Sequence, residues 1–295
     1  MLNLQWLQEL TEKHSADLQA QVQAFTLKGK PFDSALRPST MGVVNLSPDS
    51  WYRESVCLNA DMAIQRGRRL HAEGADLIDI GAESTLLQAG RVDAAGQNGA
   101  LLPVVRALSS EGILVSVETY HPAVTEACLK AGAAVLNLTG AAEAETLYRM
   151  VADHEAGVII CYVQGANVRE VDSIHLAEDH TQTLLDYFNR QVDLATAAGV
   201  KRIWIDPGMG FYYKNLQDSA ERVRYQVTTL LNTFRLRKLG WPVCHALPHA
   251  FEYFGDEVRS AESFFAVAAL LGKTDLLRTH EIPKILGVIR SMAVL

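Results

Sequence analysis

The stretch that most clearly indicates the fold is STMGVVNLSPDSWY, residues 39–52. Met41 to Val44 are apolar or small at every position, which predicts a strand buried on both faces, as in parallel sheets covered by helices. The run leads into Asn45 and a cluster of hydrogen-bonding side chains around a proline: Ser47, Pro48, Asp49 and Ser50. Ligands bind where the chain leaves the carboxyl ends of parallel strands. The stretch therefore predicts a strand that delivers a binding loop.

The same unit repeats along the rest of the chain. Residues 59–74 have a helical pattern that ends in Gly74, directly before the next apolar run, and glycine is typical of a helix end. We expect eight strands, at residues 40–45, 76–81, 113–118, 133–138, 157–163, 202–206, 242–247 and 274–279. Eight strand–helix units over about 250 residues match an α/β fold of the (β/α)₈ TIM-barrel type. A doubly wound parallel sheet is the alternative topology.

The first residues of the chain follow a different pattern. Residues 2–25 carry apolar side chains at helical spacing among charged ones, which predicts one or two amphipathic helices. Glycine and prolines follow in TLKGKPFDSALRPS, residues 26–39. We therefore expect residues 1–38 to form an N-terminal helical extension on a barrel that comprises residues 39–295.

Composition excludes several classes of protein. The 295 residues are 48% hydrophobic and 21% charged, which is ordinary for a globular protein. The net charge of −7 argues against nucleic acid as a partner but leaves room for a small anionic ligand. No apolar run has the length of a membrane span, the N-terminus lacks a signal-peptide profile, and the four cysteines have no paired spacing. We expect a cytoplasmic protein.

Polar side chains at the predicted strand ends indicate a ligand. Glu118, Asn137 and Asp206 end three different strands, and buried carboxylates and amides are costly without partners. One such residue is usually a structural hydrogen bond, but three at the same end offer acceptors and a donor to a flat, nitrogen-rich heterocycle. Asn45, Arg278 and His280, on the adjacent first and eighth strands, suit an anion such as phosphate with Mg²⁺ bridging it.

Five stretches carry a likeness to a known family: MGVVNLSPDSW (41–51), GADLIDIGAEST (74–85), ILVSVETYHPAVTEACLKAGAAVLN (113–137), IWIDPGMGF (203–211) and LLRTHEI (276–282). In this order they resemble the strand ends of the dihydropteroate synthase family, over roughly residues 40–295. The resemblance implies a barrel transferase that condenses 6-hydroxymethyl-dihydropterin pyrophosphate with 4-aminobenzoate or another amine and releases pyrophosphate. It also implies Mg²⁺ and, as is common among such synthases, a homodimer.

The resemblance implies roles for individual residues. Asn137 and Asp206 match the family's pterin-binding pair, Asn45 matches the residue near Mg²⁺ and pyrophosphate, and Arg278 and His280 match its anion-binding pair. The implied catalytic set is Asn45, Asp206, Arg278 and His280. The implied mechanism is ionisation of the pterin–CH₂–O bond and attack by an arylamine, with electrostatic stabilisation of the departing pyrophosphate.

The sequence also departs from the family pattern. Glu118 stands where the family has a pterin-contacting aspartate, and His249 replaces a lysine that lies between the two substrates. Leu86 follows Thr85 where the family has arginine. We predict that Glu118 and His249 contact the pterin. We predict that the following residues line the second-substrate site or its lid: Trp51, Tyr52, Thr85, Leu86 and Phe211.

These departures leave three interpretations open. One is a divergent synthase with a repacked amine site, and another is a paralogue that binds a pterin without turnover. A pterin-dependent methyltransferase is the third, although such an enzyme has no use for Arg278 and His280. Cys244, His245 and His249 suggest zinc, but no fourth ligand is suitably spaced, so we interpret His249 as a pocket residue.

Overall fold

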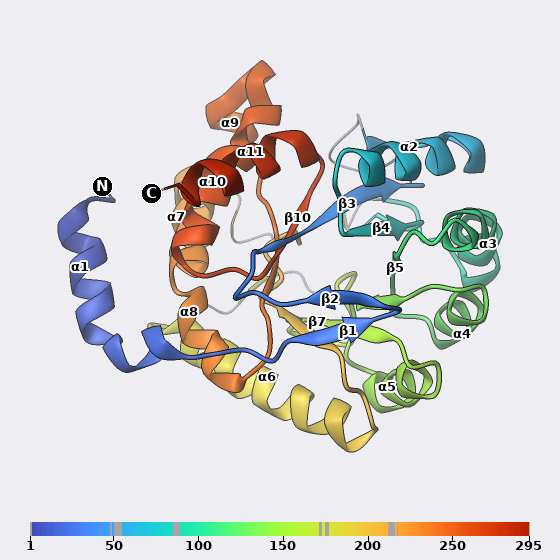
Figure 1. The fold of residues 1–295 in the computed structure, drawn as a ribbon, viewed down its shortest axis with the longest axis horizontal. Helices are drawn as coiled ribbons and strands as arrows, with labels where there is room; N and C mark the ends of the chain where they lie inside the picture. Colours follow the sequence, from blue (N-terminus) through green and yellow to red (C-terminus); the bar gives the residue numbers. More distant parts are fainter. Residues whose placement is uncertain are drawn as a thin grey trace.

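The computed structural model describes residues 2–47, 49, 55–84, 89–170, 173–174, 177–211, 216 and 218–294. Among these residues, eight parallel strands form one sheet in the order β8-β7-β6-β5-β4-β3-β10-β9 (Figure 1). The strands are β3 (Ser39–Asn45), β4 (Leu77–Gly81), β5 (Val115–Thr119), β6 (Val135–Leu138), β7 (Gly157–Cys161), β8 (Ile203–Asp206), β9 (Cys244–Ala246) and β10 (Leu276–Thr279). A parallel bridge between Ile205 and Val243 links the two ends of the sheet, so the barrel is nearly closed.

The predicted barrel is confirmed. Each of the eight expected strands is present, and its ends differ from the prediction by at most two residues. The first and last strands pair in parallel, with Leu276 opposite Ser39, which distinguishes a barrel from a doubly wound open sheet.

Helices surround the barrel (Figure 1). They are α2 (Ala60–Ala72), α3 (Ala94–Ser110), α4 (Pro122–Lys130), α5 (Ala144–Asp153), α6 (His180–Ala197), α7 (Ser219–Leu231), α8 (Thr233–Leu236), α9 (Phe251–Phe254), α10 (Val258–Leu271) and α11 (Ile282–Met292). Local sequence sets their ends. The Asn59 side chain accepts the Met62 N–H at 2.9 Å and begins α2, and Gly74, with φ of 110°, turns the chain into β4.

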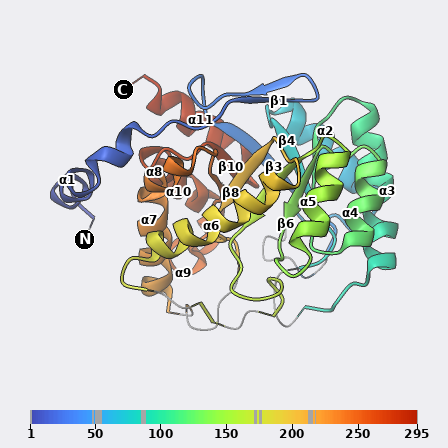
Figure 2. The same ribbon diagram turned by 90° about the horizontal axis from the view of Figure 1, so that it is seen from below.

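The N-terminal region contains a hairpin that the sequence analysis did not predict. After α1 (Leu4–Lys13) and a short 3₁₀ helix, the strands β1 (Phe25–Leu27) and β2 (Lys30–Phe32) pair antiparallel. Phe25 and Phe32 pack edge-on against Trp204, with ring centroids 4.7 and 5.2 Å away. Lys28 Nζ donates to the Gly132 carbonyl, ahead of β6, at 2.6 Å. The hairpin therefore covers the amino-terminal end of the barrel (Figure 2).

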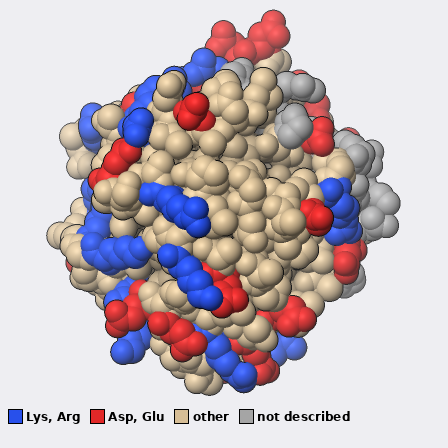
Figure 3. Space-filling view, turned by 90° about the vertical axis from the view of Figure 1, so that its right-hand side faces the viewer, with Lys and Arg blue, Asp and Glu red and all other residues tan. Residues whose placement is uncertain are grey.

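Charged side chains of both signs are mixed on the surface (Figure 3). On the face shown in Figure 3, lysines and arginines are interspersed with aspartates and glutamates, around a broad central area that carries few charges. In the described part of the chain, no helix combines the length and the apolar character needed to cross a membrane.

Candidate active site

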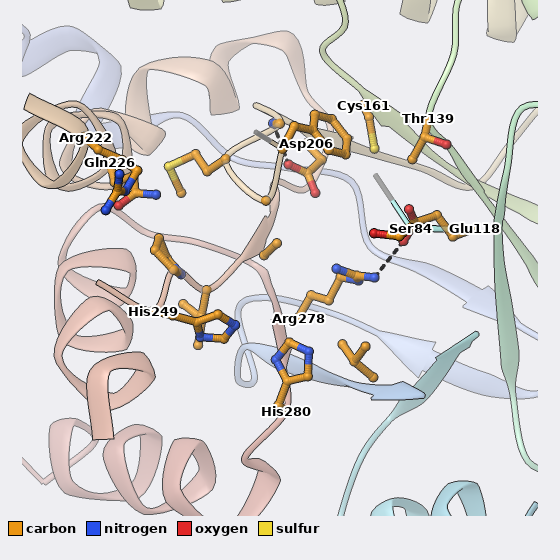
Figure 4. A pocket seen from close by; sticks show the side chains of 18 of the residues that line it. Ser84, Glu118, Thr139, Cys161, Asp206, Arg222, Gln226, His249, Arg278 and His280 are labelled. Carbon is orange, nitrogen blue, oxygen red and sulfur yellow. Dashed lines mark hydrogen bonds and ion pairs between the residues drawn. The ribbon is translucent and has the colours of Figure 1, made fainter. Parts of the chain in front are cut away.

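A cavity of about 200 Å³ opens at the carboxyl ends of the barrel strands (Figure 4). Eight of the residues predicted for the site line it: Asn45, Glu118, Asn137, Asp206, Phe211, His249, Arg278 and His280. The other four predicted residues lie outside the described part of the chain: Trp51, Tyr52, Thr85 and Leu86. The structure thus brings together, from different strands, every predicted site residue that it describes.

A buried ion-pair network forms one wall of the cavity. The Arg278 guanidinium donates through Nε to Asp79 Oδ2 at 2.7 Å. Through a terminal nitrogen it donates to Glu118 Oε2, also at 2.7 Å (Figure 4). Burial alone would lower the pKa of Arg278, but the carboxylates of Asp79 and Glu118 outweigh it and raise that pKa. Arg278 is therefore a permanent cation whose charge is matched by two acids.

Asp79 organises this network, although the sequence analysis assigns it no role. Its side chain is fully buried, and besides Arg278 it accepts from Ser116 Oγ at 2.7 Å and from Asn137 Nδ2 at 3.1 Å. The Asn137 amide oxygen lies 3.3 Å from the Cys161 thiol. These contacts hold Asn137 in one orientation. An ionisable residue inside the apolar run LIDIG was the signal that could have identified Asp79.

The carboxylates of Glu118, on β5, and Asp206, on β8, line the cavity. Burial raises the pKa of Glu118 to about 7, with Arg278 acting in the opposite direction. Burial also raises the pKa of Asp206 to about 6, although its Oδ1 accepts the Gly208 N–H at 2.8 Å. A ligand that donates hydrogen bonds to these carboxylates, or carries positive charge, stabilises their ionised forms.

Two imidazoles lie side by side in the cavity lining, and His280 is next to Arg278 (Figure 4). The ring centroids of His249 and His280 are 5.1 Å apart. Burial lowers the pKa of His249 to about 4 and the pKa of His280 well below its usual value, so both rings are neutral at pH 7. Neither histidine therefore supplies a permanent charge. The role of Arg278 and His280 as an anion-binding pair stays a prediction.

Comparison with known proteins identifies the family. The sequence matches the family described as pterin binding enzyme over residues 41–247. This chain belongs to that family. A dihydropteroate synthase from Streptococcus pyogenes serotype M6 is 29% identical over 254 residues, which cover 82% of this chain and 90% of the relative. A type-2 dihydropteroate synthase from Escherichia coli is 31% identical over 246 residues, which cover 81% and 89%.

Solved structures agree with this assignment. The dihydropteroate synthase of Xanthomonas albilineans with 4-aminobenzoic acid superposes with a TM-score of 0.75 at 28% identity, over 93% of this chain and 98% of that one. The Yersinia pestis enzyme has a TM-score of 0.78 at 23% identity, which supports the fold alone. The resemblance drawn from the strand ends is thus confirmed at the level of the family.

Asn45 and Arg222 also line the cavity, and both have hydrogen-bond partners. Asn45, at the end of β3, donates through Nδ2 to Ser55 Oγ at 2.5 Å. Arg222, on α7, lines the rim, pairs with Glu252 at 2.5 Å and donates to the Leu216 carbonyl at 3.2 Å. Sequence reasoning missed Arg222, because an arginine on an amphipathic helix is usually on a solvated face.

Proposed function

We propose that this protein is a transferase of the dihydropteroate synthase type. It condenses 6-hydroxymethyl-dihydropterin pyrophosphate with 4-aminobenzoate or another amine and releases pyrophosphate. The observation that carries the proposal is the buried network of Asp79, Asn137 and Arg278 between two cavity-facing carboxylates. The two relatives named above are dihydropteroate synthases, and this chain matches them over about nine-tenths of their length, which supports the same reaction.

The network supports a place for the pterin ring. A pterin presents ring and exocyclic N–H donors along one edge, and Asp206 and Glu118 accept such donors. Because burial raises the pKa of both acids, ring N–H groups that replace water would stabilise their ionised forms. Asn137, already held by Asp79, offers a fixed amide to the same ring.

The part of the cavity lined by Arg278 and His280 suits the leaving group. In the reaction the C–O bond between the pterin CH₂ and the pyrophosphate breaks, and its electron pair leaves with the pyrophosphate oxygen. The amine nitrogen then forms the new C–N bond and loses a proton. Arg278 and His280 both line the cavity, where the guanidinium and the neutral imidazole could donate hydrogen bonds that orient the pyrophosphate.

The residues present are compatible with Mg²⁺ that arrives with the pyrophosphate. Mg²⁺ takes oxygen ligands, keeps several waters and usually binds substrate phosphates and few protein groups. Since Asn45 Nδ2 donates to Ser55, the Oδ1 atom is the part of this side chain suited to the ion. When bound, Mg²⁺ would neutralise charge on the departing pyrophosphate. Mg²⁺ and the homodimer stay predictions.

One observation favours a second candidate function. His249, neutral at pH 7, stands where the family has lysine, and the charge of Arg278 is already paired. A family member that binds a pterin without turnover would have this arrangement. The third interpretation, a pterin-dependent methyltransferase, has no use for Arg278. It therefore predicts that an Arg278→Ala variant keeps full affinity for the pyrophosphate ester.

Pyrophosphate release tests the proposal directly. Purified protein, dihydropterin pyrophosphate and Mg²⁺ are incubated with 4-aminobenzoate and a panel of other arylamines, beside a synthase known to be active. We expect amine-dependent release that Asp206→Asn abolishes. Binding of the ester without release, with every amine, would favour the non-catalytic alternative. No binding at all would refute both.

A further inference from the structure

Three side chains from separate segments meet beside the cavity. His249 precedes α9, Glu262 lies on α10, and His280 follows β10. His280 Nδ1 lies 2.8 Å from Glu262 Oε1, and His249 Nδ1 lies 3.6 Å from the same oxygen. One potential ligand atom from each residue lies within 4.8 Å of those of the other two. The reaction proposed above assigns no role to this cluster of three side chains.

We propose that His249, Glu262 and His280 bind a divalent transition-metal ion, with Zn²⁺ the best match. Two imidazole nitrogens and a carboxylate oxygen are ligands that zinc takes in catalytic sites, with the fourth position left open. Mg²⁺ prefers oxygen ligands, so this site is chemically distinct from the Asn45 side of the cavity. The zinc ligands differ from the Cys244–His245–His249 set considered from the sequence, since His245 instead contacts Thr233.

The cluster is held in place by outer contacts. Glu262 is buried, and the Thr279 hydroxyl donates to its Oε2. The His280 backbone N–H lies 3.2 and 3.1 Å from the two Glu262 oxygens. Such outer partners orient ligating carboxylates in metal sites. Neutral imidazole nitrogens coordinate metals, and His249 and His280 each place one near the Glu262 carboxylate.

The distances fit with a small adjustment. Ligand atoms about 2.0–2.2 Å from a tetrahedral zinc ion lie roughly 3.3–3.6 Å from one another. The 3.6 Å separation of His249 and Glu262 already agrees with this. The 2.8 Å separation of His280 and Glu262 would have to widen by roughly 0.5 Å, as coordination replaces that close contact.

The surroundings tolerate an added cation. Arg278 acts on both imidazoles as a nearby positive charge, and Arg66 acts on His280 as well, but the charge of Arg278 is paired with two carboxylates. Glu281 acts on both rings in the opposite direction. His249 and His280 line the cavity, so the open coordination position would face it. Binding of the proposed ion therefore depends on the geometry of the cluster. It does not depend on which amine binds in the cavity or which reaction is catalysed there.

Metal titration tests the site in the full chain. Chelator-treated protein is titrated with Zn²⁺ against a chromophoric competitor, and we expect one ion per chain. His249→Ala and Glu262→Gln should each weaken binding on the order of 100-fold or more, since a lost outer partner alone costs about 10- to 100-fold. Thr279→Val removes such a partner and should fall in that lower range. His154→Ala, an exposed histidine at the end of α5, is the matched control and should bind like the wild type.

Two further measurements decide the case if a variant fails to fold. Co²⁺-loaded wild type should give d–d bands without a thiolate charge-transfer band, because the four cysteines are not ligands. Anomalous diffraction from Zn²⁺-soaked wild-type crystals should place a peak between His249, Glu262 and His280. Absence of stoichiometric binding, a thiolate band, a peak elsewhere, or full affinity in a His249→Ala/Glu262→Gln double variant would overturn the proposal.

Discussion

Substitution of Asp79 tests whether one buried carboxylate holds the site together. Its oxygens accept from Arg278 Nε at 2.7 Å, Ser116 Oγ at 2.7 Å and Asn137 Nδ2 at 3.1 Å. Asp79→Ala would leave the buried guanidinium with Glu118 as its one ion-pair partner among the described residues. Removing one partner of a buried ion pair costs about 3–5 kcal/mol. Because Glu118 remains, we expect a loss near the lower end, about 3 kcal/mol in the free energy of unfolding.

Asp79→Asn separates the charge from the hydrogen bonds. The amide has the same shape, its oxygen still accepts from Arg278, and its nitrogen can donate to the Ser116 hydroxyl, which accepts as well as donates. A hydrogen bond to a charged group contributes about 1.5–3 kcal/mol and a neutral one about 0.5–1.5 kcal/mol. The expected loss is therefore about 1–2 kcal/mol, clearly smaller than for alanine.

Urea unfolding followed by far-UV circular dichroism gives both values by linear extrapolation. Asp93→Asn is the matched control, because this exposed residue caps α3 and asparagine caps a helix as well as aspartate does. If the free energy of unfolding of the alanine variant lay within about 1 kcal/mol of the wild-type value, Asp79 would not be balancing a buried charge, because breaking a buried ion pair costs about 3–5 kcal/mol. Equal losses for alanine and asparagine would refute the separation of charge from hydrogen bonding.

Three other substitutions examine the site and its frame. Asp206→Asn should weaken binding of dihydropterin pyrophosphate about 10- to 100-fold in titration calorimetry, because a neutral amide accepts more weakly; unchanged affinity would mean that the ring does not contact it. Burial raises the pKa of Glu118 to about 7, so the native state keeps a proton that the unfolded chain releases near pH 4.5. The free energy of unfolding should therefore decrease as the pH rises from about 4.5 to about 7. Glu118→Gln should remove that part of the slope in urea titrations, and parallel curves would contradict it. Phe32→Ala should cost about 3–5 kcal/mol in unfolding free energy by opening space against Trp204, with ligand affinity unaltered; a weaker ligand would contradict the placement of the hairpin away from the cavity.

The barrel was predictable because its signals are local. Each strand is a short apolar run, and glycines such as Gly74, with positive φ, mark the helix ends before them. In the β1–β2 hairpin, Gly29 marks the turn with φ of 84°, but the strands give little signal, since they have three residues each and one contains Pro31. What stabilises it is distant in sequence: its phenylalanines pack on Trp204, more than 170 residues further along the chain.

The site was predictable at strand ends and not beyond them. Glu118 and Asp206 stood out because ionisable residues at the ends of apolar strands need a reason to be there. Glu262 gave no such signal, because a glutamate in a helix is usually solvated, and it is buried only where α10 packs beside β10. Its approach to His249 and His280 therefore depends on tertiary packing, which a reading of single elements does not supply.

The charges of the cavity determine what it can bind. Two carboxylates pair with Arg278, and the imidazoles of His249 and His280 are neutral at pH 7. A ring with N–H donors is favoured there without help, whereas a diphosphate meets a guanidinium whose charge is already matched. Tight binding of the diphosphate therefore requires a cation that the substrate brings, for which Asn45 offers oxygen, or one that the chain holds beside His249. A lysine at that position would supply positive charge permanently. With histidine there, the charge becomes conditional on metal, and so would any turnover that depends on it.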